Sequence, residues 1–399
     1  MLTHLSLRPS FGFGDRLGLA TPGHIAAVRG TKFAPIFAQQ SVRENVRTGR
    51  TPQQVIDDAR RAVETAKWDL PWGADADHLK ILDDLPPFVE AGYTFFTVDP
   101  GDHVDNSADL DSHEILQQKV ANFNWDELSA LYLNHNEEQV WGQFAKSPKG
   151  ETESFMRAVV KYGKAIQHTC SMFGYLSQVK DQFDFEVSVD ETDSPTTPLE
   201  HFFIANELRR LGVRFTSLAP RFLGRFEKGV DYIGDLNALD IELGKHAAVT
   251  AYFGTYKLSL HSGSDKFGVY PLVAKHWGEH IHVKTAGTSY LEALRVLASH
   301  EPDLFLKIYS LGRECYEVDK LTYHVSASLE LLPGINDLPS LLNDFHAREM
   351  LHVTFGSAIA KFGLELKSAL IKHEDAYYEG LRVHFEKHLD LLKDKNESG

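Results

Sequence analysis

The sequence predicts an α/β fold of the (β/α)₈ TIM-barrel class, with extra helices inserted into the barrel and added at its C-terminal end. Two observations lead to this prediction. Short apolar or β-branched runs alternate with longer segments of helical period along the 399 residues, as in proteins built on a parallel sheet. Polar residues gather directly after these runs, at the edge where a barrel carries its functional residues.

We expect eight strands, each apolar enough to be buried on both faces. In chain order they lie within residues 13–20, 33–38, 73–78, 93–98, 183–189, 215–219, 257–260 and 280–283. Thr21-Pro22-Gly23 is expected to be the turn that ends the first strand. The chain is expected to form a single domain over residues 1–399, with a helical insertion around 108–182 and a helical extension around 290–399.

The charge composition of the chain argues against two classes of binding partner. The chain has 41 Lys and Arg against 56 Asp and Glu, a formal net charge of −15, which argues against general affinity for nucleic acids or anionic membranes. A small molecule is therefore the expected partner, and an anionic one would need local positive groups. A homo-oligomer is possible.

The two cysteines, Cys170 and Cys315, lie far apart in the sequence and form no C-x-x-C motif, which favours a reducing compartment. The first ten residues contain no sustained apolar region, and no run of about 20 apolar residues occurs. These features predict a soluble, cytoplasmic protein.

The stretch K-L-S-L-H-S-G-S-D-K, residues 257–266, indicates a strand that ends at His261 and a turn of small residues before a helix. A histidine at the carboxyl end of a barrel strand faces the ligand-binding side. The N–H groups at the start of the next helix could bind an anion.

Three polar clusters follow alternate strands of the predicted barrel. They are Asp77-His78 after the third strand, Asp190-Glu191-Thr192-Asp193 after the fifth and His261 after the seventh. Two imidazoles and a carboxylate could bind a divalent cation, and the remaining carboxylates could move protons. Taken singly, Asp77 could be a helix N-cap, the acidic run a solvated loop and each histidine a partner of its neighbours. Their shared placement favours one site.

The Asp77-His78 pair and the later L-H-S-G-S motif resemble the class II, metal-dependent aldolases. Longer motifs lie along nearly the whole chain, namely F-G-F-G-D-R-L-G-L-A-T-P-G-H, G-A-D-A-D-H, V-D-E-T-D-S-P-T-T-P, F-E-K-G-V-D-Y-I-G-D, L-H-S-G-S-D-K and H-V-K-T-A-G-T-S-Y-L-E-A. Together these motifs resemble the tagaturonate epimerase family.

The family resemblance implies interconversion of D-tagaturonate and D-fructuronate in hexuronate catabolism, with a divalent metal cation. The inverted carbon lies β to the ketone, so its C–H is not acidified and simple enolisation cannot invert it. Retro-aldol cleavage of the adjacent carbon–carbon bond, rotation of the aldehyde and re-addition would invert it. A cation that polarises the ketone would stabilise the developing charge.

Residue by residue, the resemblance implies His78 and His261 as metal ligands. The third ligand is expected after the sixth strand, with Glu227 as first choice and Asp231 as second. Asp77 fits the acceptor of the hydroxyl proton. Asp190, or failing it Glu191, fits the proton donor on the other face.

The substrate carboxylate would need a cationic partner. Candidates are Arg221, Lys284 and Arg16, with the N–H groups of Gly263 and Ser264 as an alternative. Lys284 could instead be a Schiff-base nucleophile, although nothing obvious in the sequence would lower its pKa.

Other functions stay open. A class II aldolase acting as a lyase would release the fragments, an epimerase of neutral ketohexoses would act on tagatose and fructose, and a non-catalytic protein would only bind sugar acids. The ligand types do not distinguish Zn, Mn, Fe, Co or Ni.

Overall fold

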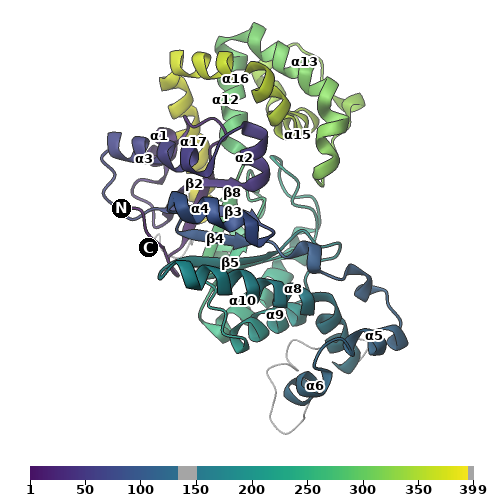
Figure 1. Cartoon of the computed structure of the whole chain (residues 1–399). Coiled ribbons are helices and arrows are strands. Elements are labelled where there is room, and N and C mark those ends of the chain that lie inside the picture. The colour runs from purple at the N-terminus through teal and green to yellow at the C-terminus, as the bar shows by residue number, and fades with distance from the viewer. Residues whose placement is uncertain (134–150, 394–399) are drawn as a thin grey trace.

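The computed structural model describes residues 1–133 and 151–393 and contains a closed barrel of eight parallel strands surrounded by helices (Figure 1). Each strand pairs with the next in chain order, and the eighth pairs back with the first. The predicted fold class is therefore confirmed. The strands are β1 Ser10–Gly14, β2 Ala34–Ser41, β3 Gly73–Leu79, β4 Phe95–Val98, β5 Asp184–Val189, β6 Ser217–Pro220, β7 Lys257–Leu260 and β8 Ile281–Thr285.

The helices fall into a shell around the barrel, an insertion after β4 and an extension after β8. The shell and insertion contain α1 Thr21–Val28, α2 Val42–Thr48, α3 Pro52–Thr65, α4 Leu85–Ala91, α5 His113–Val120, α6 Trp125–Leu133, α8 Glu151–Val179, α9 Pro198–Arg210, α10 Leu236–Phe253, α11 Tyr270–Trp277 and α12 Thr288–His300. The extension contains α13 Pro302–Asp319, α14 Leu338–Leu341, α15 Phe345–Val353, α16 Phe355–Lys372 and α17 Glu374–Leu391. None of the helices in the described parts of the chain is both long and apolar enough to cross a membrane.

Several helices begin at side-chain caps that the sequence supplies. Ser41, Thr51 and Thr197 each accept a hydrogen bond from the N–H three residues later and so satisfy a free helix donor. Each cap directly precedes the first helical residue. Caps of this kind end the loops sharply and fix where the following helix packs on the barrel.

The first strand was predicted wrongly, because it occupies Ser10–Gly14 and not residues within 13–20. Phe11 and Phe13 are fully buried and belong to the strand. The segment after it is a turn held by Asp15, whose carboxylate accepts hydrogen bonds from the N–H groups of Leu17 and Ala20, among others. The predicted turn Thr21-Pro22-Gly23 begins α1, because proline is well tolerated in the first turn of a helix.

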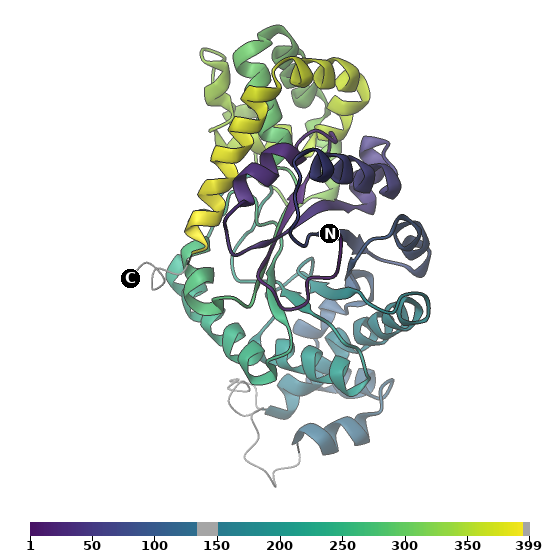
Figure 2. The same cartoon turned by 90° about the vertical axis from the view of Figure 1, so that its left-hand side faces the viewer.

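The extension packs on the barrel, as Figures 1 and 2 show from two sides. Its last helix, α17, lies along α1, and the ring of Phe385 contacts Phe13 of β1 with centroids 5.0 Å apart. Gly23 of α1 packs so closely against Leu381 that a Cβ atom at this position would clash with the leucine side chain. The C-terminal helix is therefore part of the shell that surrounds the first strand.

Polar groups buried at the amino end of the barrel are hydrogen-bonded to one another. At the amino end of β7 the ammonium of Lys257 donates hydrogen bonds to the carbonyl of Arg8 at 2.8 Å and to Ser10 Oγ at 2.9 Å. Ser10 Oγ also bonds His282 Nδ1 at 2.9 Å. A buried charge is tolerated only when hydrogen bonds or an opposite charge compensate it, and the same rule applies to the groups nearer the functional site.

Candidate active site

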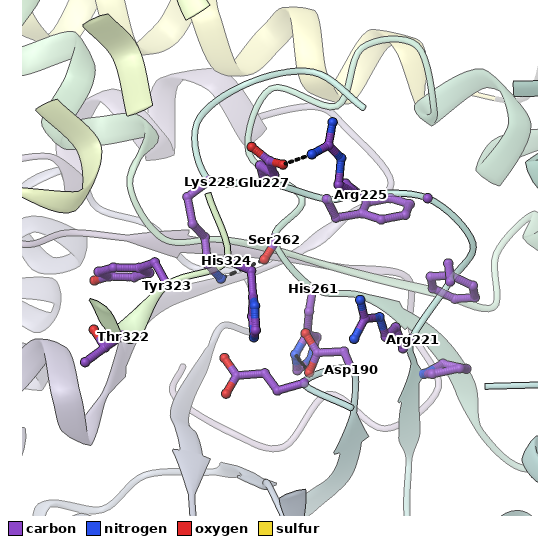
Figure 3. A pocket seen from close by; sticks show the side chains of 15 residues that line it. Asp190, Arg221, Arg225, Glu227, Lys228, His261, Ser262, Thr322, Tyr323 and His324 are labelled. Atoms are coloured by element: carbon purple, nitrogen blue, oxygen red, sulfur yellow. Dashed lines mark hydrogen bonds and ion pairs between the residues drawn. The ribbon is translucent and has the colours of Figure 1, made fainter. Parts of the chain in front are cut away.

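A pocket of about 250 Å³ opens at the carboxyl ends of β5, β6 and β7 (Figure 3). The loops after these strands form one wall. The other wall is the segment Thr322–His324 of the C-terminal extension, which the sequence did not predict as part of a site. The lining residues are Asp190, Glu191, Pro220, Arg221, Phe222, Gly224, Arg225, Phe226, Glu227, Lys228, His261, Ser262, Thr322, Tyr323 and His324.

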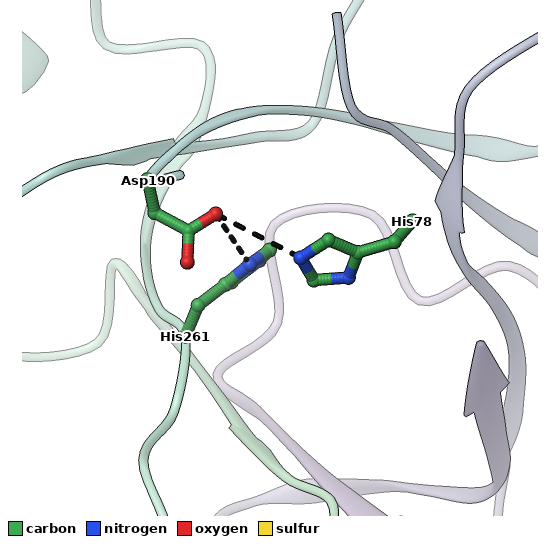
Figure 4. A group of neighbouring side chains, drawn as sticks. All are labelled: His78, Asp190 and His261. Atoms are coloured by element: carbon green, nitrogen blue, oxygen red, sulfur yellow. Dashed lines mark ion pairs between the residues drawn. The ribbon is translucent and has the colours of Figure 1, made fainter. Parts of the chain in front are cut away.

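Three side chains predicted from alternate strands meet beside this pocket, which Asp190 and His261 also line (Figure 4). Asp190 Oδ1 lies 3.3 Å from His261 Nδ1 and 3.8 Å from His78 Nε2. The ligating atoms of His78, Asp190 and His261 all lie within 4.8 Å of one another. Ligands bound about 2.1 Å from a tetrahedral ion are roughly 3.4 Å apart, so the group has the size and the donor types that a divalent cation requires.

The ring nitrogen of each histidine that faces away from this group is bonded to a carboxylate. His78 Nδ1 lies 2.9 Å from Asp77 Oδ1, and His261 Nε2 lies 2.7 Å from Glu186 Oε1. Metal-binding histidines commonly donate their second N–H to a carboxylate, which fixes the tautomer and the ring orientation. Both imidazoles are therefore oriented to present a lone pair to a shared cation.

His78 reaches this position through an irregularity in β3. Its φ is +53°, which is unusual for a residue other than glycine, and the register of β3 against β4 shifts between Ala76 and Leu79. In a regular strand neighbouring side chains point to opposite faces. The irregularity lets Asp77 and His78 bond each other at the same end of the barrel.

Without a cation, the neighbouring carboxylates favour the protonated forms of both histidines and the ionised form of Asp190. Burial lowers the pKa of His78, but Asp77 and Asp190 together raise it well above its ordinary value. Burial also lowers the pKa of His261, and Asp190 and Glu186 raise it above the usual range. Burial raises the pKa of Asp190, whereas His261 and His78 hold it well below the usual range. A cation would take the place of the imidazolium protons.

Lys284, predicted as a substrate-binding cation, is buried in a carboxylate network. Its Nζ lies 2.7 Å from Asp75 Oδ2, 2.8 Å from Asp77 Oδ1 and 2.9 Å from Glu186 Oε1. Burial alone would lower the pKa of Lys284, but these carboxylates raise it above its ordinary value. The neutral amine that a Schiff base needs is therefore disfavoured, and the lysine instead balances the acids below the two histidines.

Arg16, a second predicted partner of the substrate carboxylate, already binds other groups of the protein. Its Nε donates to Glu44 Oε1 at 2.9 Å, its Nη1 donates to the carbonyl of His352, and its guanidinium stacks on Phe355. The side chain is buried and does not line the pocket. Of the three predicted cations only Arg221 lines the pocket.

The segment between His261 and the next helix is longer than predicted. The next helix, α11, begins only at Tyr270, so no helix N-terminus lies at Gly263 or Ser264. The N–H of Gly263 donates to the carbonyl of Lys284 at 2.9 Å. The predicted anion site at these two residues is wrong in this respect, because the N–H of Gly263 is used within the barrel and no helix dipole points there.

Glu227, the first choice for the third metal ligand, lines the pocket, but its carboxylate is bonded to other residues of the chain. Its Oε2 accepts hydrogen bonds from the N–H of Ser326 at 2.9 Å and from Ser326 Oγ at 2.8 Å, and its Oε1 lies 3.3 Å from Arg225 Nη1. Asp231, the second choice, accepts from the N–H of Gly268. The group around the two imidazoles contains Asp190 in place of either.

Glu227 and Glu349 together hold the segment that covers the pocket. Glu349 Oε2 accepts from the N–H groups of Ser326 at 3.1 Å and Ala327 at 2.8 Å. Burial and the neighbouring Glu227 raise the pKa of Glu349 to about 8. Glu349 therefore carries a proton near neutral pH, and the two carboxylates fix the chain close after His324.

The Glu349→Gln variant is expected to lose less stability on alkalinisation than the wild type. The folded pKa of Glu349 lies above its unfolded value of about 4.3, so its stabilising proton is present at low pH and is lost as pH rises through about 8. That loss costs at most about 1.4 kcal/mol per pH unit. Melting temperatures of both proteins between pH 6 and 9 test this, with exposed Glu330→Gln as control. Parallel curves for all three would contradict it.

A second group with metal-ligating side chains lies behind β7, formed by Asp265, His384 and His388. Asp265 Oδ2 already accepts from Arg348 Nη2 at 2.8 Å, and His388 Nε2 accepts from the N–H of Asp265 at 3.0 Å. A guanidinium beside the carboxylate opposes a cation, and one imidazole lone pair is used. This group is best explained as a buried ion pair that joins α15 and α17 to the barrel.

Known proteins resemble this chain along almost its whole length. The sequence profile of the tagaturonate epimerase family matches residues 3–392. The chain belongs to this family. The tagaturonate/fructuronate epimerase of Thermotoga maritima is 43% identical over 394 residues, which cover 97% of this chain and 81% of that protein. The resemblance inferred from the motifs is thereby confirmed.

Solved structures agree with this assignment. The native crystal structure of a fructuronate-tagaturonate epimerase from Cohnella laeviribosi is 38% identical, with a TM-score of 0.92 over 98% of this chain and 83% of that one. A complex of the same protein with two glycerols gives a TM-score of 0.93 over 99% and 83% of the two chains. A probable tagatose 6-phosphate kinase from Sinorhizobium meliloti, at 10% identity and a TM-score of 0.52, shares the fold. The aldolase-like site remains a prediction.

Proposed function

We propose that the protein interconverts D-tagaturonate and D-fructuronate and that it depends on a divalent cation held by His78, Asp190 and His261. The observation that supports this most is the arrangement of two imidazoles and one carboxylate within 4.8 Å, each imidazole backed by a further carboxylate. Asp190 takes the ligand role that was predicted for Glu227. When bound, the cation polarises the substrate ketone and stabilises the charge that develops on its oxygen.

Asp77 is proposed to accept the hydroxyl proton as the carbon–carbon bond breaks. It lines a small cavity together with His78 and His261, on the barrel side of the main pocket. Lys284 Nζ, 2.8 Å from Asp77 Oδ1, keeps the carboxylate charged and correctly aimed between turnovers. The Nδ1 of His78 provides its second hydrogen-bond partner.

The proton on the opposite face is assigned to Glu191. With Asp190 acting as a ligand, Glu191 is the remaining carboxylate of the acidic run that lines the pocket. Burial raises the pKa of Glu191, but His78 and Lys228 among its neighbours bring it below its ordinary value, so Glu191 is charged at rest and has to receive the proton released in the cleavage step before it can donate it. A residue on each side of the aldehyde is what inversion by rotation and re-addition requires.

Epimerisation in D₂O tests the route. Cleavage and re-addition keep the hydrogen of the inverted carbon in place as the aldehyde hydrogen, so proton NMR of the product is expected to show no deuterium there. Deuterium can enter the carbon that forms the enediolate. Protein from which the metal has been removed serves as the control for exchange without catalysis. Full deuteration at the inverted carbon would contradict the retro-aldol route and favour two-base proton exchange by Asp77 and Glu191.

A further inference from the structure

The positively charged side chains that line the pocket differ in whether a carboxylate of the protein pairs with them. Arg225 is paired with Glu227, with Nη1 and Oε1 3.3 Å apart. Among the residues that the structure describes, neither Lys228 nor Arg221 forms an ion pair within 4.0 Å, although the charge of Lys228 helps to lower the pKa of the nearby Glu191. In a chain with a net charge of −15, an unpaired cation inside a pocket is a local attraction for an anionic ligand.

Lys228 is the unpaired cation that faces the two histidines. It lines both the main pocket and the small cavity bounded by Asp77, His78 and His261, whereas Arg221 lines only the main pocket. Its Nζ donates to Ser262 Oγ at 2.6 Å, and Figure 3 shows the side chain running toward this hydroxyl. Ser262 directly follows the proposed ligand His261, so the ammonium is held at a defined place beside the cation site.

The backbone that carries Lys228 is also fixed. The buried ammonium of Lys266 donates to the carbonyls of Glu227 at 2.7 Å, Val230 at 2.5 Å and Ser264 at 3.0 Å. These bonds tie the loop after β6 to the loop after β7. Gly229, with φ of +73°, supplies the turn next to Lys228 that few other residues would tolerate. The position of Lys228 relative to His261 is therefore set by the fold.

We propose that Lys228, positioned by Ser262, binds the carboxylate of the sugar acid and sets the preference for a uronate over the corresponding neutral ketose. This inference rests on the proposed function. An ammonium suits the reaction because it is a compact charge with rotatable donors, whereas the planar fork of arginine fixes a carboxylate bidentately. The aldehyde fragment that carries the carboxylate has to turn before the bond re-forms, and an ammonium lets it turn without releasing it.

The test compares Lys228→Gln with Arg221→Gln, a matched removal of the other unpaired cation. For each protein, kcat and KM are measured with tagaturonate, and the inhibition constant of tagatose, the neutral counterpart, is measured against the same reaction. Lys228→Gln is expected to raise KM for tagaturonate by about 10- to 100-fold, the usual range for a lost charged hydrogen bond, with the tagatose constant and the metal content unchanged. Arg221→Gln is expected to change KM much less.

Three results would overturn the inference: an unchanged KM in Lys228→Gln, an equal loss of affinity for tagaturonate and tagatose, or the larger effect in Arg221→Gln. Lys228→Arg provides a further check. It is expected to recover much of the KM while kcat stays low, because the charge returns but the carboxylate is held in one orientation. A wild type that fails to epimerise tagaturonate would instead refute the proposed function, so the two failures are distinguishable.

Discussion

Removal of the divalent cation is expected to abolish turnover while leaving the fold almost unchanged. The cation is proposed to stabilise the charge on the ketone oxygen, and Lys284, below the two histidines, is already shared among three carboxylates and does not replace it. The fold should persist because the apolar core is large and independent of the site, unlike that of small domains that fold around a metal. Chelated protein is assayed with tagaturonate and melted in parallel, and activity should return when metal is added.

Substitution of the proposed ligands is expected to have the same effect. His78→Ala and His261→Ala should lower kcat by roughly 10³ or more, the scale of several kcal/mol of lost transition-state stabilisation, and metal content should fall. His384→Gln, in the second group of metal-ligating side chains, is the matched control and should keep its metal and its activity. Full activity in exhaustively chelated protein, or loss of metal only in His384→Gln, would refute the assignment.

The barrel and the convergence of the three clusters could be predicted from sequence because both follow from local patterns. Buried parallel strands are apolar over their whole length, and β7 was predicted with its observed bounds, Lys257–Leu260. The carboxyl ends of parallel strands all lie at one end of a barrel. Polar residues that end β3, β5 and β7 therefore had to approach one another, which brought His78, Asp190 and His261 together.

The choice among carboxylates could not be predicted, because it depends on contacts between segments far apart in sequence. Glu227 accepts a hydrogen bond from Ser326, 99 residues further along the chain, and no pattern in the sequence near Glu227 indicates that partner. The segment Thr322–His324 is likewise held at the pocket by residues far away in the sequence, since Arg43 and Arg47 bind it through the Thr322 carbonyl at 3.0 Å and the Tyr323 hydroxyl at 2.9 Å. Helical periodicity in the extension carries no information about such contacts.

Lys228 was overlooked although it lies in the motif F-E-K-G-V-D. The signal that could have identified it is the Gly229 that follows, since a glycine beside a charged residue after a strand often marks a turn that presents the side chain. No comparable signal in the sequence indicated the carboxylates that pair with Arg16 and Lys284. Glu44 and Asp75 are separated from them by 28 and 209 positions, so only the closed barrel reveals the pairs.

Asp77→Asn is expected to lower kcat by roughly 10² or more, the usual scale for loss of a general acid–base group. Burial raises the pKa of Asp77, but His78 and Lys284 hold it well below the usual range, so the wild-type side chain is charged and able to accept a proton. Asparagine keeps the size of the side chain and an oxygen that can accept from His78 Nδ1, yet it cannot accept the hydroxyl proton.

The same carboxylate also orients His78, and that role has to be separated from proton transfer. Loss of an orienting carboxylate lowers metal affinity, commonly by about 10- to 100-fold, and such a defect would disappear at saturating metal. We therefore expect Asp77→Asn to show normal metal content and still low kcat when metal is in excess. Ser188→Ala is a suitable control, since Ser188 Oγ lies 3.3 Å from His261 Nδ1 and carries no proton that the reaction requires. Recovery of full kcat in Asp77→Asn by added metal would leave Asp77 as an orienting group only, and would move the proton acceptor to Glu191.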